Sequence, residues 1–280
     1  MTEYLKGARP IQIQEVLVHY ENFKFIKVDK DSYSNVWRQW LTYSNLKTLA
    51  NLDQFTHVDY TAGTSQTFDH FALKHANRHI RMLRGDFQYT ACIARHNNFS
   101  YLDKNSIESG QALIISLPFS DYGKEHPEFR SILDRCNQLQ IPVCLDLAYW
   151  GIAKNVHIDL AHYPCITEIT SSLSKPFYVL ENHRVGVRFS RSYQNDGISM
   201  LNEVNQQNFY SMSLGMYFMR QFSCDWIWNI HEQQYKNICH DHQLTPTDTV
   251  IFALGDQDRH REFNRGIENN FRVCISNFFV

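Results

Sequence analysis

Four short segments carry side chains that could act together on one small ligand. The first is Gly63-Thr64-Ser65-Gln66, between an expected strand and an expected helix. Glycine permits a sharp turn, and the free amides at a helix start, together with two hydroxyls, suit a phosphate group. Taken alone, the segment is more typical of an ordinary helix cap.

The second segment, Val143 to Tyr149, places Asp146 at the end of an apolar strand. Burying a carboxylate there is unfavourable unless a cation or a hydrogen-bond donor meets it. A protonated pyridine nitrogen is one such partner, and Tyr149 could reach a phenolic oxygen on the same ring. The alternative is that Asp146 caps the next helix.

The third and fourth segments are Ser171-Ser172-Leu173-Ser174-Lys175 and Arg184-Val185-Gly186. Burial lowers the pKa of a lysine and makes its amine a usable nucleophile. Arginine suits a phosphate because its planar fork bonds two oxygens at once. Singly, each residue is more typical of a solvated loop or an edge strand.

In order and spacing the four segments resemble the fold-type-I pyridoxal-phosphate (PLP)-dependent aminotransferases, the class I/II family of aspartate and tyrosine aminotransferases. In that family a Gly-Ser/Thr-Gln loop takes the phosphate, and Asp-x-x-Tyr takes the pyridine nitrogen and the phenolic oxygen. A Ser-x-Ser-Lys supplies the Schiff-base lysine, which forms the internal aldimine, and Arg-x-Gly completes the phosphate site. The similarity runs from about Tyr60 to Phe189 and resumes at the C-terminus.

The resemblance implies catalytic roles for Lys175, Asp146 and Tyr149. It implies a cofactor-binding set made of Gly63, Thr64, Ser65, Gln66, Phe87, Tyr89, Ser120, Asp146, Tyr149, Ser172, Ser174, Lys175 and Arg184. Phe87 and Tyr89 are the two candidates for the aromatic over the ring, with Phe87 preferred.

The segment Asn270 to Ser276 resembles the family strand whose arginine binds the substrate α-carboxylate, so Arg272 is the expected substrate-binding residue. The alternative is an exposed edge-strand arginine. Three departures from the family pattern are visible. Ser120 stands where an asparagine is usual, Arg184 is one residue further from Lys175 than is common, and the chain is short.

The elements that would position these residues alternate between strand and helix. Expected strands are Gln12–Val18, Phe23–Val28, His57–Tyr60, Tyr89–Ile93, Ala112–Leu117, Ile141–Leu145, Ile166–Ile169, Val185–Phe189, Thr249–Leu254 and Phe271–Ile275. Expected helices carry Trp37 to Leu46, Phe68 to Leu83, Pro127 to Leu139 and a long region from Gly197 to His240. Short apolar strands separated by helices favour a parallel sheet covered on both faces.

The expected fold class is therefore α/β, with a mostly parallel, seven-stranded type of sheet and a reduced α+β small domain. The expected divisions are residues 1–55, an N-terminal arm with part of the small domain, and 56–205, a large PLP-binding domain. Residues 206–280 would form an interdomain helix and the rest of the small domain.

Composition excludes several other classes. The net charge of −2 gives no field for nucleic acid, and no apolar run reaches the roughly 20 residues of a membrane span. Seven scattered cysteines and a start without a secretory signal favour a cytoplasmic protein. Histidine pairs such as His75 and His79 lack further converging ligands, so no metal is expected.

The resulting hypothesis is an aminotransferase that acts on an amino acid and a 2-oxo acid. The resemblance also implies a homodimer with the active site at its interface. Two alternatives stay open: another PLP-dependent reaction on an amino acid, such as decarboxylation, elimination or oxidation, and a non-catalytic binding module on the same fold.

Overall fold

The computed structural model describes residues 8–94, 98–102, 107–267 and 271–279. Within these ranges the largest sheet has seven strands. In sheet order they are β2 (His57–Ala62), β9 (Val185–Ser190), β8 (Ile166–Ser172), β6 (Val143–Asp146), β5 (Gln111–Ser116), β3 (His79–Met82) and β4 (Phe99–Tyr101). From β8 to β4 the neighbours run parallel, whereas β9 is antiparallel to β8 and β2. The predicted α/β fold with a mostly parallel sheet is confirmed.

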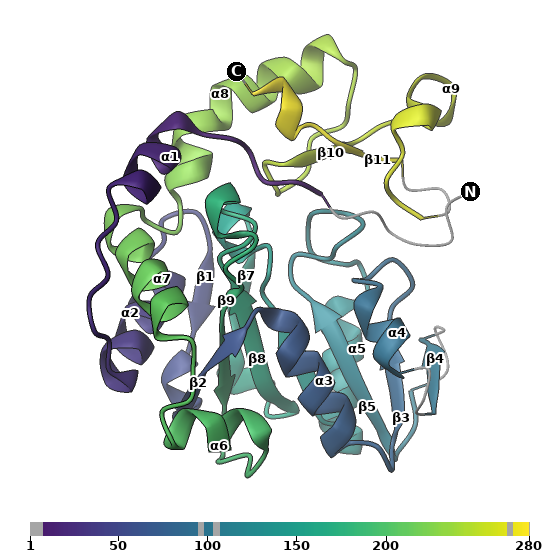
Figure 1. The fold of residues 1–280 in the computed structure, drawn as a ribbon. Coiled ribbons are helices and arrows are strands. Elements are labelled where there is room, and N and C mark those ends of the chain that lie inside the picture. The colour runs from purple at the N-terminus through teal and green to yellow at the C-terminus, as the bar shows by residue number, and fades with distance from the viewer. Residues whose placement is uncertain (1–7, 95–97, 103–106, 268–270, 280) are drawn as a thin grey trace.

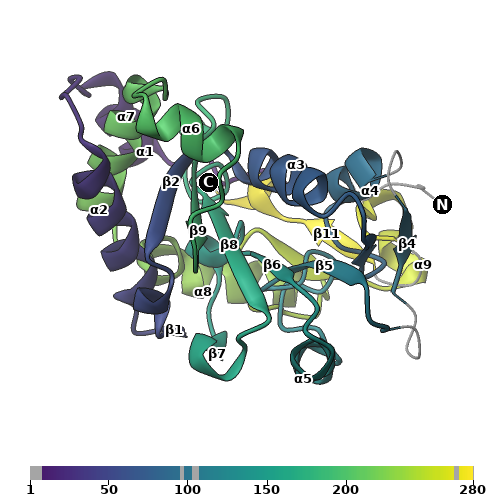
Figure 2. The same ribbon diagram turned by 90° about the horizontal axis from the view of Figure 1, so that it is seen from below.

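Helices cover both faces of this sheet (Figure 1, Figure 2). On one face lie α3 (Thr64–Lys74), α4 (Tyr89–Ala94) and α6 (Gly197–Glu203), and on the other lies α5 (Phe129–Leu139). Beside the β2 edge are α1 (Gln14–Glu21), α2 (Lys30–Thr42) and α7 (Phe209–Gln221). A short parallel pair, β1 (Thr48–Ala50) and β7 (His157–Asp159), lies apart from the main sheet.

Strand β5 shows why both faces must be covered. Its side chains alternate between two cores: Leu113 and Ile115 pack in the core that contains α5, and Ala112 and Ile114 in the core beneath α3. Every residue of the strand is buried. An unbroken apolar run is therefore what a strand buried on both sides requires.

The C-terminal part forms a separate core at one end of the sheet (Figure 1). It contains α8 (Trp226–Asp241), α9 (Gln257–His260) and the antiparallel pair β10 (Phe252–Leu254) and β11 (Arg272–Cys274). Ala8 and Ile11, from the N-terminal segment, are buried in the same core. The domain divisions at residues 55 and 205 stay predictions, and residues 1–7 of the expected arm lie outside the described residues.

Several expected elements have the wrong type. Gln12–Val18 was expected as a strand, but residues 14–21 form helix α1, and residues 23–28 contain neither helix nor strand. Tyr89–Ile93 belongs to helix α4, not to a strand. Such short apolar runs fit either period, and tertiary packing decides between them.

Helix and strand boundaries also differ from the predicted ones. Helix α3 ends at Lys74, and Ile80, whose spacing suits the same helix face, belongs to β3 instead. The expected long helical region is three helices. The side chains of Asp196 and Asn208 begin α6 and α7 by accepting hydrogen bonds from the backbone amides of Ser199 and Ser211.

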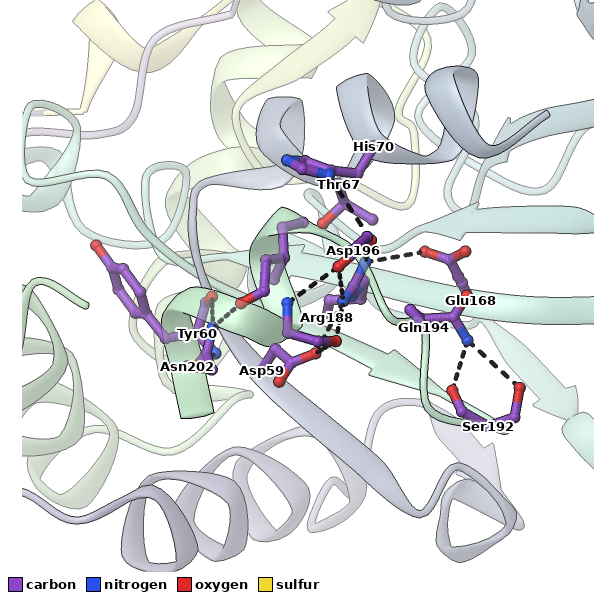
Figure 3. A network of polar contacts seen from close by, with 12 residues as sticks. Asp59, Tyr60, Thr67, His70, Glu168, Arg188, Ser192, Gln194, Asp196 and Asn202 are labelled. Carbon is purple, nitrogen blue, oxygen red and sulfur yellow. Dashed lines mark hydrogen bonds and ion pairs between the residues drawn. The ribbon is translucent and has the colours of Figure 1, made fainter. Parts of the chain in front are cut away.

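A buried ion cluster fixes the β2–β9–β8 side of the sheet under α3 (Figure 3). Arg188 of β9, with no exposed side-chain surface, donates to Asp59 at 2.9 Å and to Asp196, and its Nη1 lies 3.8 Å from Glu168. Thr67 of α3 bonds Thr170 of β8 at 2.9 Å. These contacts hold α3, and therefore its N-terminus, in a fixed position over the sheet.

Candidate active site

A cavity of about 310 Å³ lies where the ends of β6 and β8 meet the start of α3. Its size is near the lower limit of the roughly 300–1,000 Å³ usual for small-molecule sites. The lining residues are Thr64, Ser65, Phe87, Tyr89, Ser116, Pro118, Ser120, Asp146, Ala148, Tyr149, Ser172, Ser174, Lys175, Glu181 and Arg184. Most of the predicted cofactor residues therefore surround one space.

One end of the cavity is suited to an anion. The first turn of α3, which is described in full, has no acidic residue, and no side chain caps it. Arg184 donates from Nη2 to the Ser65 hydroxyl. Helix N-termini and arginine forks both favour phosphate.

Gly63 and Arg184 both have positive φ angles, +78° and +55°. A methyl group at Gly63 would lie 2.8 Å from Arg184 Nη2, so glycine is what allows the guanidinium to lie against the turn. A left-handed arginine is unfavourable, and such strain gathers at ligand sites.

The neighbouring polar side chains divide into two groups. Ser172 and Ser174 line the cavity and bond each other at 3.1 Å. Gln66 instead accepts a 2.7 Å hydrogen bond from the Ala62 amide and does not line the cavity. Its side chain stabilises the turn that begins α3.

Asp146 lies at the other end of the cavity and is 4% exposed. Burial, followed by the nearby Asp86 carboxylate, raises its pKa to about 8, and the hydrogen bond that Oδ1 accepts from the Ala148 amide (2.9 Å) partly offsets this. A cation bound here would restore the charged form of Asp146.

Lys175 follows β8 and projects into the same space. Its Nζ donates to the Ala8 carbonyl at 2.7 Å. Burial lowers the pKa of Lys175, and Glu181 partly offsets that effect. A lowered pKa leaves more of the amine neutral, which is the nucleophilic form.

Both aromatic candidates line the cavity. The rings of Phe87 and Tyr89 stack with centroids 6.1 Å apart and an angle of 16° between their planes. The Tyr89 hydroxyl donates to both carboxylate oxygens of Asp69 at 2.9 Å, whereas Phe87 is 40% exposed. Phe87 is therefore the more exposed of the two rings, and the choice between them stays a prediction.

Arg272 lies behind the cavity wall and is not among the lining residues. Its Nη1 donates to the Ser120 carbonyl at 2.9 Å and to the Tyr149 hydroxyl at 3.4 Å. Its guanidinium lies over the Phe252 ring, 5.1 Å from the centroid. In this arrangement Arg272 supports Tyr149 and Ser120, and its predicted contact with a substrate carboxylate would need the guanidinium to reach past them.

Three polar residues of the site were not found from the sequence: Asp86, Ser116 and Glu181. Ser116 and Glu181 line the cavity, and Asp86 lies behind Ser116. The signal for Asp86 was present, because it follows the buried strand β3 much as Asp146 ends β6. Nothing in the sequence distinguishes Glu181 from an ordinary surface acid.

Over the described residues no group of three or more His, Cys, Asp and Glu side chains is placed to hold a metal ion. Among the same residues, none of the helices combines the length and the apolar character needed to cross a bilayer.

The chain matches known proteins in structure but not in sequence. No family model and no curated protein sequence matches the chain. Tyrosine aminotransferase from Leishmania infantum matches with a TM-score of 0.63 at 15% identity, over 97% of this chain and 88% of that one. The PLP-bound C-S lyase from Staphylococcus hominis, in complex with L-cycloserine, matches with a TM-score of 0.67 at 11% identity, over 98% and 84%.

The chain has the fold of the PLP-dependent aminotransferases. L-threonine-O-3-phosphate decarboxylase from Porphyromonas gingivalis shares it as well, with a TM-score of 0.57 at 13% identity, over 93% of this chain and 89% of that one. Because one fold serves transfer, lyase and decarboxylase activities, the reaction has to be argued from the site.

Proposed function

We propose that the protein is a PLP-dependent aminotransferase in which Lys175 holds the cofactor covalently. One observation carries the proposal: a single cavity brings together an anion-binding helix start with Arg184, the buried Asp146 carboxylate and the Lys175 amine. These match the phosphate, the ring nitrogen and the aldehyde of PLP. No other common cofactor offers all three groups.

The buried carboxylate of Asp146 indicates whether PLP suits this cavity. Asp146 has a pKa raised to about 8 and a backbone amide as its hydrogen-bond donor. A protonated pyridine nitrogen would supply the missing positive charge. When bound, PLP supplies an electron-withdrawing ring that stabilises negative charge at the substrate Cα.

Lys175 would act twice. Its amine, which burial keeps more neutral, would be the nucleophile that holds the cofactor through the aldehyde carbon, with loss of water. When it is free, the same amine would be the base that takes a proton from the substrate Cα and the acid that gives a proton back. The lowered pKa of Lys175 supports both roles.

The remaining residues bind and orient. Arg184, Thr64, Ser65, Ser172 and Ser174 would hold the phosphate. Tyr149, which accepts a hydrogen bond from Arg272, would donate to the phenolic oxygen. Arg272 would bind the carboxylate of the amino acid or 2-oxo acid after leaving the Ser120 carbonyl.

A different PLP-dependent reaction is the second candidate. It is favoured by the structural matches, which include a C-S lyase and a decarboxylase at similar TM-scores. The same cofactor contacts serve all these reactions. A non-catalytic module is disfavoured, because a scaffold has no need for a buried lysine amine beside a buried aspartate.

We also propose a homodimer. Phe25 is 53%, Ile26 64% and Tyr210 45% exposed, and the rings of Phe25 and Tyr210 stack with centroids 6.5 Å apart. Tyr210 also contacts the ring of His183, next to Arg184 at the phosphate end of the cavity. A second copy covering these residues would close that end. Light scattering after size-exclusion chromatography tests this, and a monomer at micromolar concentration would contradict it.

The first experiment is the absorbance spectrum of the protein with PLP. We expect the wild type to show a near-visible band, which borohydride reduction removes as it fixes the cofactor covalently onto Lys175. Lys175→Ala should lack the band. The control is Lys236→Ala, whose side chain is 56% exposed and forms a surface ion pair with Glu232. Absence of the band from the wild type would refute the proposal.

Product analysis separates the two enzymatic candidates. Incubation with amino acids and a 2-oxo acid acceptor should give a new amino acid and a new 2-oxo acid in equal amounts. Release of CO₂, ammonia or a thiol without amino transfer would show one of the other reactions instead.

A further inference from the structure

Asp86 is a second buried carboxylate at the Asp146 end of the cavity. It is 3% exposed and follows Gly85, which has a φ of +98°. Its Oδ2 accepts from the Ser116 amide at 2.9 Å, and its Oδ1 accepts from the Phe87 amide at 2.9 Å. Oδ1 also accepts from the hydroxyls of Ser116 and, at 2.9 Å, Ser120.

The two carboxylates belong to adjacent strands. Ser116, which binds Asp86, is the register partner of Asp146 in the β5–β6 pair. The charge of Asp86 acts on Asp146, and among the described residues neither carboxylate has a cationic partner. Two buried acids without a cation are unfavourable, so the protein alone leaves this end of the cavity short of positive charge.

The hydroxyls of Ser116 and Ser120 separate Asp86 from the cavity. Both hydroxyls donate to Asp86 Oδ1, and their oxygens lie 3.2 Å apart in the cavity wall, so towards the cavity they can serve as acceptors. Ser120 therefore cannot donate to a ligand while it bonds Asp86. The wall at this end presents two carboxyl groups and hydrogen-bond acceptors, and a bound cation would favour the charged forms of both carboxyls.

We propose that Asp86 is a positioning residue that, together with Asp146, makes this end of the cavity selective for a positively charged ring nitrogen. The inference rests on the proposed function, because PLP is the ligand that would bring such a nitrogen. Asp86 does not touch the ligand. It acts through its charge and through the two serines that it orients.

The test compares two probes that differ at the ring nitrogen. PLP can carry a proton there, whereas its 1-deaza analogue has a C–H group in that position and cannot. Dissociation constants of both probes are measured for the wild type, Asp86→Asn and Ser120→Ala. Asparagine keeps the shape and can still accept from the Ser116 amide, and Ser120→Ala keeps the Asp86 charge.

We expect the wild type to bind PLP more tightly than the deaza analogue. In Asp86→Asn the ratio of the two dissociation constants should change roughly tenfold towards equal binding. Ser120→Ala should keep it to within about threefold. An unchanged preference in a folded Asp86→Asn overturns the inference while leaving PLP binding intact. If the wild type binds neither probe, the proposed function itself fails.

A second variant keeps the test decisive if Asp86→Asn does not fold. Removing the nearer carboxylate with Asp146→Asn should weaken PLP binding but leave a residual preference of severalfold over the deaza analogue, because Asp86 still contributes negative charge. Complete loss of the preference in Asp146→Asn would show that Asp86 contributes nothing.

Discussion

The Asp146 side chain favours ligand binding at the expense of the ligand-free fold. Burial raises its pKa from 3.8 to about 8, so below that pH the folded apoprotein retains a proton that the unfolded chain releases. Apoprotein stability should therefore fall as the pH rises from about 5 to about 8, with a slope approaching about 1.4 kcal/mol per pH unit from this group. Asp146→Asn should flatten that slope, as measured by urea unfolding of the apoprotein at several pH values.

The control for this prediction is Asp134→Asn, which changes an exposed acid on α5 and should keep the wild-type slope. Equal slopes for the wild type and Asp146→Asn would mean that Asp146 is charged in the folded apoprotein. The repulsion from Asp86 would then be weaker than the geometry indicates.

The close contact between Gly63 and Arg184 leads to a second prediction. In Gly63→Ala the added methyl would lie 2.8 Å from Arg184 Nη2 and would push the guanidinium off the turn. Losing a charge-assisted bond to phosphate should weaken PLP binding by about ten- to a hundredfold. Fluorescence titration with PLP measures the change.

Gly110→Ala is the matched control, because Gly110 also has a positive φ (+82°) but has open space where the methyl group would go. Both variants place an alanine at a positive φ angle. If both bind PLP equally well, the place of Gly63 beside Arg184 has no role in the site.

The site residues that the sequence revealed are those whose proposed partner is the ligand. Asp146 ends a strand, Lys175 follows one and Arg184 precedes one, and together they fit one family spacing. Asp86 was missed, and the contacts of Arg272 could not be predicted, because the partners of both come from remote segments. Ser116 and Ser120 lie 30 and 34 residues from Asp86, and the Ser120 carbonyl lies 152 residues from Arg272.

Among the elements, α3 packs over a cluster of charged side chains that no local sequence pattern predicts. Arg188, beneath it, is fully buried among Asp59, Glu168 and Asp196 (Figure 3). Burial raises the pKa of Glu168, and the Arg188 charge partly offsets this. Without the arginine, the carboxylates of Asp59, Glu168 and Asp196 would lie close together without the buried positive charge between them.

We therefore expect Arg188→Met to lower the free energy of unfolding by roughly 3–5 kcal/mol near neutral pH. Urea unfolding measures the loss. The control is Lys74→Met. The Lys74 side chain is 36% exposed and its amine lies 3.4 Å from Glu168, so its removal should lower the free energy of unfolding by no more than about 1 kcal/mol. Equal stabilities of Arg188→Met and the wild type would show that the cluster contributes no net stability.

The sheet could be predicted better than its surroundings. Strands such as β5 and β6 are buried along their whole length, so their consecutive apolar residues can be recognised in the sequence. Helices α1 and α4 are short, and their type is set by what they pack against. Strand order could not be predicted either, because β2 joins the sheet through β9, more than 120 residues later.

Across the whole molecule, the segment before α1 joins distant parts of the chain. Ile11 is 2% exposed in the core formed by α8, β10 and β11, and the Ala8 carbonyl receives the Lys175 amine. Ile11→Ala should lower the free energy of unfolding by roughly 2–5 kcal/mol through the cavity that it leaves. Thermal and urea unfolding measure this loss.

Val18→Ala serves as the control, since Val18 on α1 is 45% exposed and should cost little. If Ile11→Ala is as stable as Val18→Ala, the N-terminal segment is held by its backbone contacts and not by the core.

The hydrogen bond from Lys175 to Ala8 has a thermodynamic consequence. A lysine amine engaged by a ligand cannot also donate to the Ala8 carbonyl, and a buried carbonyl left without a donor costs about 1–3 kcal/mol. Ligand loading and closure of the N-terminal segment are then negatively coupled, and reciprocity requires each to weaken the other by the same factor. Amide hydrogen exchange at residues 11–13 would accordingly speed up on loading, and the start of the chain would report what is bound at its centre.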